Sequence, residues 1–302
     1  MSWLLITLSS YLILAIVFLI DKYLLMGPIP NPKVYAFYSG ILGVLILLLI
    51  PFVGFSIPLP SQIILSFLAG FFFIYGIFWF YKALQLFEPS RIVPAVGGML
   101  PLFTFGLIYI FSTEKETFSL SEFLAFILLI LGSALIAYEK SKKISLKNLQ
   151  ISIITALLLA FYFVLAKYIY IAQPFWSGYI WIRIGAFLTA LCFLLFSTDV
   201  KKEILKKRKI IPKSTSLFLF NQGLGAGANI LQNWAVALVP LVYVAMINAL
   251  QGTQYVFLLI FTIFLSLKFP KILKEEISKE VLVQKIIAIL LIGGGLSLLA
   301  FK

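Results

Sequence analysis

The sequence contains ten stretches of mostly apolar residues, and each is close to the roughly 20 residues that a helix needs to cross a bilayer. The stretches are 3–25, 34–53, 62–86, 90–111, 119–138, 149–170, 175–197, 215–238, 240–266 and 281–301. Glu88-Pro89-Ser90 and Pro240 supply the two narrowest breaks, because proline begins or ends a helix more readily than it continues one. The sequence therefore predicts an all-α integral membrane protein with ten transmembrane helices.

Composition excludes the soluble classes of protein. Hydrophobic residues make up 62% of the 302 residues and charged residues only 12%, whereas a soluble domain carries about 25% charged residues. We expect a multi-pass protein of the cell membrane that contacts lipid and a small-molecule substrate, as a monomer or homodimer. The net charge of +13 then marks cytoplasmic loops and does not indicate a nucleic-acid partner.

Catalytic and metal-binding residue types are scarce. The chain has no histidine and a single cysteine, Cys192, inside an apolar run. An intramembrane enzyme needs a nucleophile–base pair, a carboxylate dyad or metal ligands at depth. The sequence offers none of these, so we expect no enzyme activity, no metal and no cofactor.

The two halves of the chain resemble each other. A charged stretch, EKSKKISLKNLQ (139–150), separates them. Residues 81–105 align without gaps on 233–257, and ILGSALIAY (130–138) matches IGGGLSLLA (292–300). Because five spans is an odd number, the second half would cross the membrane upside down. This pattern predicts two inverted five-helix repeats, 1–142 and 143–302, with a substrate site between them.

The same features resemble a known family. They are Ala83-Leu84, the small or proline-containing start of the fourth span, Pro101 within it, and the similar endings of the fifth and tenth spans. On these residues the chain is similar to EamA-type members of the drug/metabolite transporter superfamily. The resemblance covers nearly the whole chain. It implies a carrier of small metabolites that works by alternating access, and it leaves the substrate open.

Basic residues bear on which side faces the cytoplasm. Lys and Arg concentrate in the links after odd-numbered spans, among them Lys33, Arg91 and the run 201–213, whereas the other links hold little beyond Lys115. The positive-inside rule therefore favours both termini outside. The family resemblance implies both termini inside, so the two indications disagree.

The amide-rich stretch NQGLGAGANILQNWA (221–235) draws attention as a binding motif. A phosphate loop needs a strand before it and a helix after it, in water, so apolar spans on either side exclude that interpretation. We predict that inward-facing polar residues of the eighth and ninth spans line a substrate cavity, with bridging between packed helices as the alternative. The residues are Gln222, Asn229, Asn233, Asn248, Gln251 and Tyr255.

Two further sets complete the predicted site. In the third span Tyr75 and Trp79 follow Phe71 at helical spacing, which predicts an aromatic wall or ordinary packing. Arg183 lies inside the seventh span. There it either reaches the interface or, if buried, binds a substrate carboxylate or phosphate. Together the sets favour an amino-acid-like, aromatic or amphipathic metabolite.

We assign conformational roles to five residues, Lys22, Lys82, Pro94, Pro101 and Lys167, as hinges or gates. Lysines near span ends also reach the interface, and Lys82 with Glu88 and Arg91 also fits a solvated loop. The acids nearest the bilayer, Asp21, Glu88 and Glu122, all lie near span ends, which favours a facilitator or exchanger over a proton-driven pump. We expect the carrier to act as an exporter or facilitator. A lipid or polyprenyl-phosphate flippase is the alternative, because basic loops and Arg183 suit a phosphate headgroup.

Overall fold

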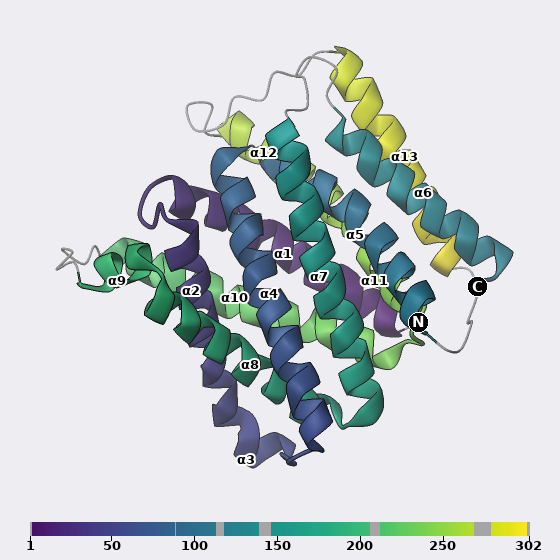
Figure 1. The fold of residues 1–302 in the computed structure, drawn as a ribbon. Coiled ribbons are helices and arrows are strands. Elements are labelled where there is room, and N and C mark those ends of the chain that lie inside the picture. Colours follow the sequence, from purple (N-terminus) through teal and green to yellow (C-terminus); the bar gives the residue numbers. More distant parts are fainter. Residues whose placement is uncertain are drawn as a thin grey trace.

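The chain forms a bundle of long helices (Figure 1). The computed structural model describes residues 2–87, 89–112, 118–138, 146–205, 212–268 and 279–300. Within these ranges the structure contains helices and no strand. The first half contains α1 (Ser2–Met26), α2 (Pro32–Leu42), the 3₁₀ helix η1 (Gly43–Leu49), α3 (Ile50–Val53), α4 (Pro60–Leu86), α5 (Pro89–Phe111) and α6 (Leu120–Ala137). The second half contains α7 (Leu146–Ala172), α8 (Phe175–Phe196), α9 (Thr198–Leu205), α10 (Pro212–Leu238), α11 (Tyr243–Ala249), α12 (Gln251–Lys268) and α13 (Lys279–Ala300).

Every predicted span falls on helix, and within the described residues seven helical segments are long and apolar enough to cross a membrane. This result supports a membrane-embedded protein. The other predicted spans correspond to α6, which has a shorter apolar core, and to α10 and α11–α12, which carry the amide residues. The predicted repeat boundary, between residues 142 and 143, lies outside the described residues.

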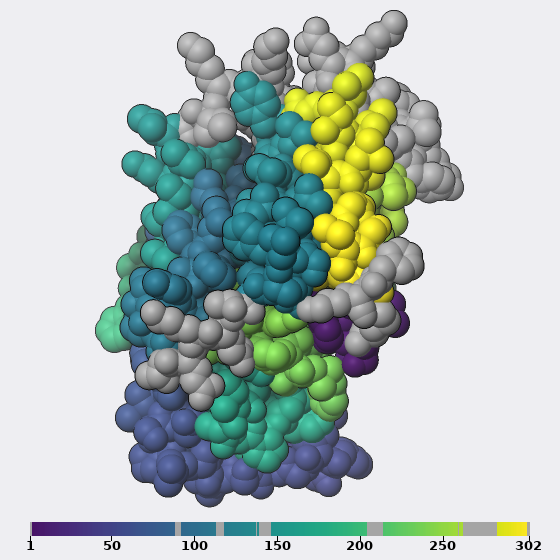
Figure 2. All heavy atoms as spheres, turned by 90° about the vertical axis from the view of Figure 1, so that its right-hand side faces the viewer, coloured from purple at the N-terminus to yellow at the C-terminus, as the bar shows by residue number. Residues whose placement is uncertain are grey.

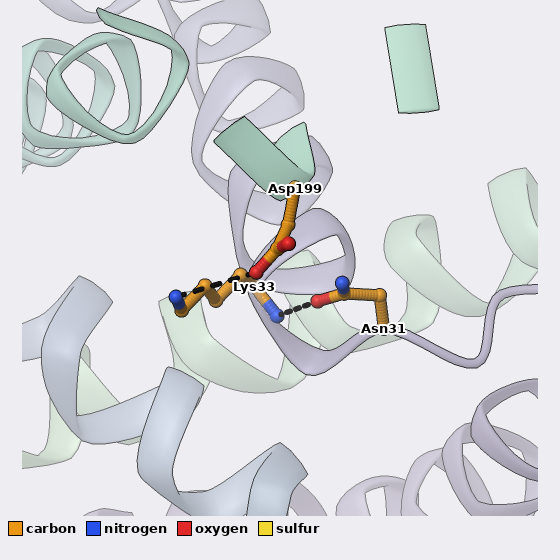
Figure 3. A network of polar contacts seen from close by, with 3 residues as sticks. All are labelled: Asn31, Lys33 and Asp199. Atoms are coloured by element: carbon orange, nitrogen blue, oxygen red, sulfur yellow. Dashed lines mark hydrogen bonds and ion pairs between the residues drawn. The ribbon is translucent and has the colours of Figure 1, made fainter. Parts of the chain in front are cut away.

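Helix starts follow local sequence rules. Proline occupies the first turn of α2 and α4 and begins α5 and α10, where its missing N–H leaves no hydrogen bond unmade. Asn31 caps α2 by accepting a hydrogen bond from the backbone N–H of Lys33 at 3.0 Å (Figure 3). The Lys33 ammonium forms an ion pair with Asp199 of α9 at 3.5 Å, the single ion pair found in the described part of the chain.

Packing pairs elements from opposite halves. The helix α4 packs on α7, and α1 packs on α10, so the first predicted span of each half packs on the third predicted span of the other. The fifth predicted spans of the two halves, α6 and α13, lie side by side, as Figures 1 and 2 both show. Gly132 of α6 faces Ile292 and Gly295 of α13 faces Leu129, and an added Cβ would lie 2.6 Å and 2.9 Å from those side chains. Small residues therefore set the closeness of this pair.

Another close approach joins α4 to α8. A Cβ added at Gly70 would lie 2.3 Å from the backbone nitrogen of Ala186, and one at Gly185 would lie 2.6 Å from the Cα of Phe67. The two backbones therefore touch, and no side chain fits between them. This crossing fixes the position of α8 and of the arginine that it carries two residues before Gly185.

Candidate functional site

A cavity of about 450 Å³ lies within the bundle. Its lining comes from α1, α2, η1, α4 and α5 of the first half and from α7, α8, α10 and α12 of the second. A volume of this size accommodates a small metabolite. Because the lining is mostly apolar and aromatic, its few polar and charged side chains decide which groups a ligand must carry.

Arg183 of α8 supplies positive charge to this cavity. The residue is 7% exposed, so it is buried and does not reach the interface by snorkelling. Its Nε and one terminal nitrogen donate to the Tyr179 hydroxyl at 3.0 and 2.7 Å, and that nitrogen also donates to Oδ1 of Asn229. The guanidinium stacks 4.7 Å from the ring centre of Phe73. Among the described residues no carboxylate pairs with it.

A second layer of polar groups holds Asn229 in place. Nδ2 of Asn233 donates to Oδ1 of Asn229 at 3.0 Å. Hydroxyls from α7 contact Asn233 in turn: Tyr162 and Tyr170 donate to its Oδ1 at 2.9 and 2.8 Å. Asn229 lines the cavity whereas Asn233 does not, so Asn233 acts as a positioning residue for the Arg183 end.

Asp21 of α1 supplies negative charge elsewhere in the cavity lining. It is 1% exposed, and its Oδ1 accepts hydrogen bonds from the Tyr35 hydroxyl at 2.5 Å and from Nδ2 of Asn221 at 2.7 Å. The place of Asp21 near the end of a predicted span did not indicate that it lines a cavity. The sequence did carry a signal, since an ionisable residue inside an apolar helix is costly and usually functional.

Gln222 and Gln251 also line the cavity, as predicted from their spans. Gln251 begins α12, immediately after the junction with α11. Its Oε1 has no hydrogen-bond partner in the described structure. The break in the ninth span therefore places an unsatisfied amide against the cavity.

Asn248 and Tyr255 do not reach the cavity. Nδ2 of Asn248 donates to the Thr104 hydroxyl at 2.9 Å, and the Tyr255 hydroxyl donates to the backbone carbonyl of Val93 at 2.7 Å. Both bonds join the ninth span to α5. For these residues the structure favours bridging between helices, which was the alternative interpretation of the polar residues in these spans.

The predicted aromatic wall of α4 lies on a different face of that helix. The cavity is lined by Phe73, Ile77, Phe80 and Tyr81, which recur at helical spacing. Tyr75 instead packs on Phe71 and Phe193, with ring centres 4.5 and 5.1 Å apart. Lys82 covers the Trp79 ring at 4.3 Å. An apolar helix gives no periodic signal for which face turns inward, so the stripe was assigned to the wrong face.

Two predicted gates bind helix ends. Lys22 of α1 donates to the carbonyls of Leu84 and Phe87 at 2.6 and 3.0 Å, at the C-terminal end of α4. Lys167 of α7 donates to the carbonyl of Ala237 at 3.1 Å, at the end of α10. Cations in these positions satisfy terminal carbonyls and the negative end of the helix dipole. Each lysine thus joins the first predicted span of its half to the third predicted span.

The predicted hinge prolines, Pro94 and Pro101, lie inside α5, which is helical from Pro89 to Phe111. Their role in bending stays a prediction. Of the loop cluster around Lys82, Glu88 and the side chain of Arg91 lie outside the described residues.

Comparison with known proteins identifies the fold and no family. No family model matches the chain, and no curated protein matches its sequence. A solved crystal structure resembles it with a TM-score of 0.64, over 99% of this chain and 96% of the other, at 18% sequence identity. The likeness extends over both whole chains, so the helix arrangement is one that a known protein adopts.

Proposed function

We propose that the protein is a multi-pass membrane carrier that moves a small metabolite by alternating access, as an exporter or facilitator. The metabolite has an apolar or aromatic body and an anionic group. Both halves of the chain contribute to one cavity, which is the arrangement expected where a carrier binds its substrate between repeats. Membership of the EamA-type drug/metabolite transporters is part of this proposal.

Equivalent contacts in the two halves support inverted repeats. Lys22 and Lys167 make corresponding hydrogen bonds, each from the first predicted span of a half to the end of the third predicted span. The helix packing is also equivalent, because α1 packs on α10 as α7 packs on α4, the first span of one half on the third span of the other. Such equivalence suits a carrier whose two states differ by which half is closed.

Arg183 is the observation that carries the proposal. A buried guanidinium is costly unless it is paired, and here its hydrogen-bond partners are neutral. A substrate carboxylate or phosphate would pair with the guanidinium through charge-assisted, bidentate hydrogen bonds. Phe73 and the other aromatic residues of the lining then contact the apolar body of the substrate.

The test begins with a thermal-stabilisation screen of amino acids and aromatic carboxylates on the purified protein, followed by counterflow of a radiolabelled hit in proteoliposomes. Arg183→Gln should weaken binding of an anionic hit about tenfold or more, because hydrogen bonds to charged groups contribute about 1.5–3 kcal/mol. Lys202→Gln, on the exposed α9, is the matched control for loss of a cation. If Arg183→Gln and Asn229→Ala both bound the anionic hit as tightly as the wild-type protein, the placement of the substrate site at these residues would be contradicted.

A lipid or polyprenyl-phosphate flippase is the second candidate. Four cavity-lining residues, Leu45 on η1 and Leu219, Gly223 and Ala226 on α10, are exposed, so protein covers the cavity least between these helices. An acyl or prenyl chain would fit there while its phosphate contacts Arg183. Movement of a labelled lipid phosphate in the same proteoliposomes, without saturable counterflow of a water-soluble solute, would favour this function.

A further inference from the structure

Asp21 gives the cavity a second charged group, which the proposed function does not use. We propose that Asp21, Tyr35 and Asn221 form a cation subsite that holds a proton when the cavity is empty and the ammonium group of a substrate when it is filled. The inference rests on the proposed carrier function and deepens it. It predicts that the substrate carries a cationic amine and that its transport exchanges with protons.

The hydrogen bonds around Asp21 leave acceptors available to a cation. Both donors, Tyr35 and Asn221, bind the same carboxylate oxygen, Oδ1, and no described residue donates to Oδ2. Oδ1 of Asn221 is buried and has no hydrogen-bond partner. An ammonium group brings three donors and no acceptor. The free carboxylate oxygen and the free amide oxygen are acceptors of the kind that it requires.

Charged neighbours do not neutralise Asp21. The adjacent Lys22 of α1 directs its ammonium to the carbonyls at the end of α4. The ionisable groups from other elements are the phenols of Tyr35 on α2 and Tyr81 on α4. Arg183 on α8 also lines the cavity and forms no ion pair with Asp21. From α10 come the neutral amides of Asn221 and Gln222.

A buried carboxylate without a cation is unstable as an anion, so the empty site should hold a proton. When a substrate ammonium binds, the carboxyl proton leaves to water through the open cavity, and the resulting carboxylate pairs with the ammonium. One proton is released for each ammonium bound. Return of the empty carrier then carries a proton across the membrane in the opposite direction. A pH gradient would therefore drive transport, which the sequence alone did not favour.

Three probes with the same phenyl body separate the contributions of Asp21 and Arg183. Phenethylamine carries only the ammonium group, 3-phenylpropionate only the carboxylate, and L-phenylalanine both. Binding is measured by calorimetry on the full-length protein in detergent, and proton release by an indicator dye in weak buffer at several pH values around neutrality. We expect phenethylamine and phenylalanine to release protons on binding and 3-phenylpropionate to release none.

Asp21→Asn is nearly isosteric and should abolish the proton release. It should also weaken phenethylamine binding about tenfold or more while sparing 3-phenylpropionate. Arg183→Gln should do the reverse. Asp199→Asn is the matched control, because it neutralises an exposed aspartate that pairs with Lys33 (Figure 3) and does not line the cavity. If Asp21→Asn does not fold, Asn221→Ala serves as a second variant and should weaken phenethylamine binding alone.

Each outcome decides between the two proposals. Phenethylamine binding without proton release at any pH, or unchanged by Asp21→Asn, overturns the cation subsite. Failure of phenethylamine to bind while 3-phenylpropionate binds through Arg183 also overturns it and leaves the carrier of anionic metabolites standing. Asp21-dependent binding of phenethylamine with no effect of Arg183→Gln on any probe supports the subsite and contradicts the anion site. If none of the probes binds, the subsite is rejected for amines of this size.

Discussion

Two groups of glycines in this bundle do opposite things. At the crossing of α4 and α8, Gly70 and Gly185 lie against backbone atoms of the facing helix, 2.3 and 2.6 Å from where a Cβ would be. In α10, Gly223 and Gly227 have nothing within 4 Å of that position. The first pair brings two helices together, whereas the second pair leaves open space, beside the cavity at Gly223.

The comparison teaches that a glycine in an apolar helix does not by itself indicate that another helix packs closely there. The GxGxG spacing of α10 suggests tight packing, since small residues allow helices to approach. The structure gives that role instead to glycines of other helices, among them Gly70 and Gly185, which share no motif. What decides the role is whether a neighbouring helix crosses at that point, and this is a property of the fold.

The largest effect should follow from filling the closed crossing. Gly185→Leu places a side chain where the backbone of Phe67 and Ser66 lies, and backbone cannot give way as a side chain does. We expect destabilisation beyond the roughly 1–3 kcal/mol typical of overpacking, seen as loss of monodisperse protein and a lower melting temperature in detergent.

Gly223→Leu is the matched control for the same change in size. It should leave the melting temperature near the wild-type value and reduce counterflow, because the leucine would occupy the open side of the cavity. Equal destabilisation by the two leucines would show that the comparison is wrong.

An intermediate effect is expected at Gly97, whose neighbour is the end of a side chain. A Cβ there would lie 1.6 Å from the Tyr255 hydroxyl, so Gly97→Ala should displace Tyr255 and break its bond to the Val93 carbonyl. The expected loss is about 1–2 kcal/mol in the free energy of unfolding. Removing the hydroxyl first, in Tyr255→Phe, should make the alanine less harmful, and a double-mutant cycle measures the difference. If the two substitutions had strictly additive effects on the free energy of unfolding, the proposed displacement of Tyr255 would be contradicted.

The smallest effect belongs to Gly227→Ala. Open space surrounds this position, so the added methyl meets no atom, and the helix gains from replacing glycine by up to about 1 kcal/mol. The melting temperature should stay the same or rise slightly. A clear fall would mean that α10 packs against another helix in a second state of the protein, and crosslinking from that position would then identify the partner.

Much of the helical framework was predictable from sequence. Runs of apolar residues placed all the predicted spans on helix, and proline marked where α2, α4, α5 and α10 begin. The finer features were not readable in this way. The second span changes from α-helix to 3₁₀ at Gly43, and the ninth is divided at Leu250, because backbone geometry there depends on tertiary contacts.

The candidate site was predictable in part. Arg183, Gln222, Asn229 and Gln251 reach the cavity because polar groups in apolar helices turn away from lipid. The same rule does not separate a residue that lines a cavity from one that bridges two helices. Asn233, Asn248 and Tyr255 bridge helices and do not line the cavity. Position along the span misled for Asp21, because a residue near the end of a span can still be buried by other helices, here by α2 and α10, which supply Tyr35 and Asn221.

The 3₁₀ segment η1 has a mechanical consequence for the Arg183 end of the cavity. None of its seven residues is buried, and its first residue, Gly43, lies beside the arginine, 3.8 Å from Cδ to an added Cβ. A 3₁₀ helix rises about 2.0 Å per residue and an α-helix about 1.5 Å. The same seven residues wound as α-helix would be shorter by about 3.5 Å. A change of η1 from 3₁₀ to α-helix would therefore shorten the second span beside Arg183, the charged group that we expect the substrate to contact.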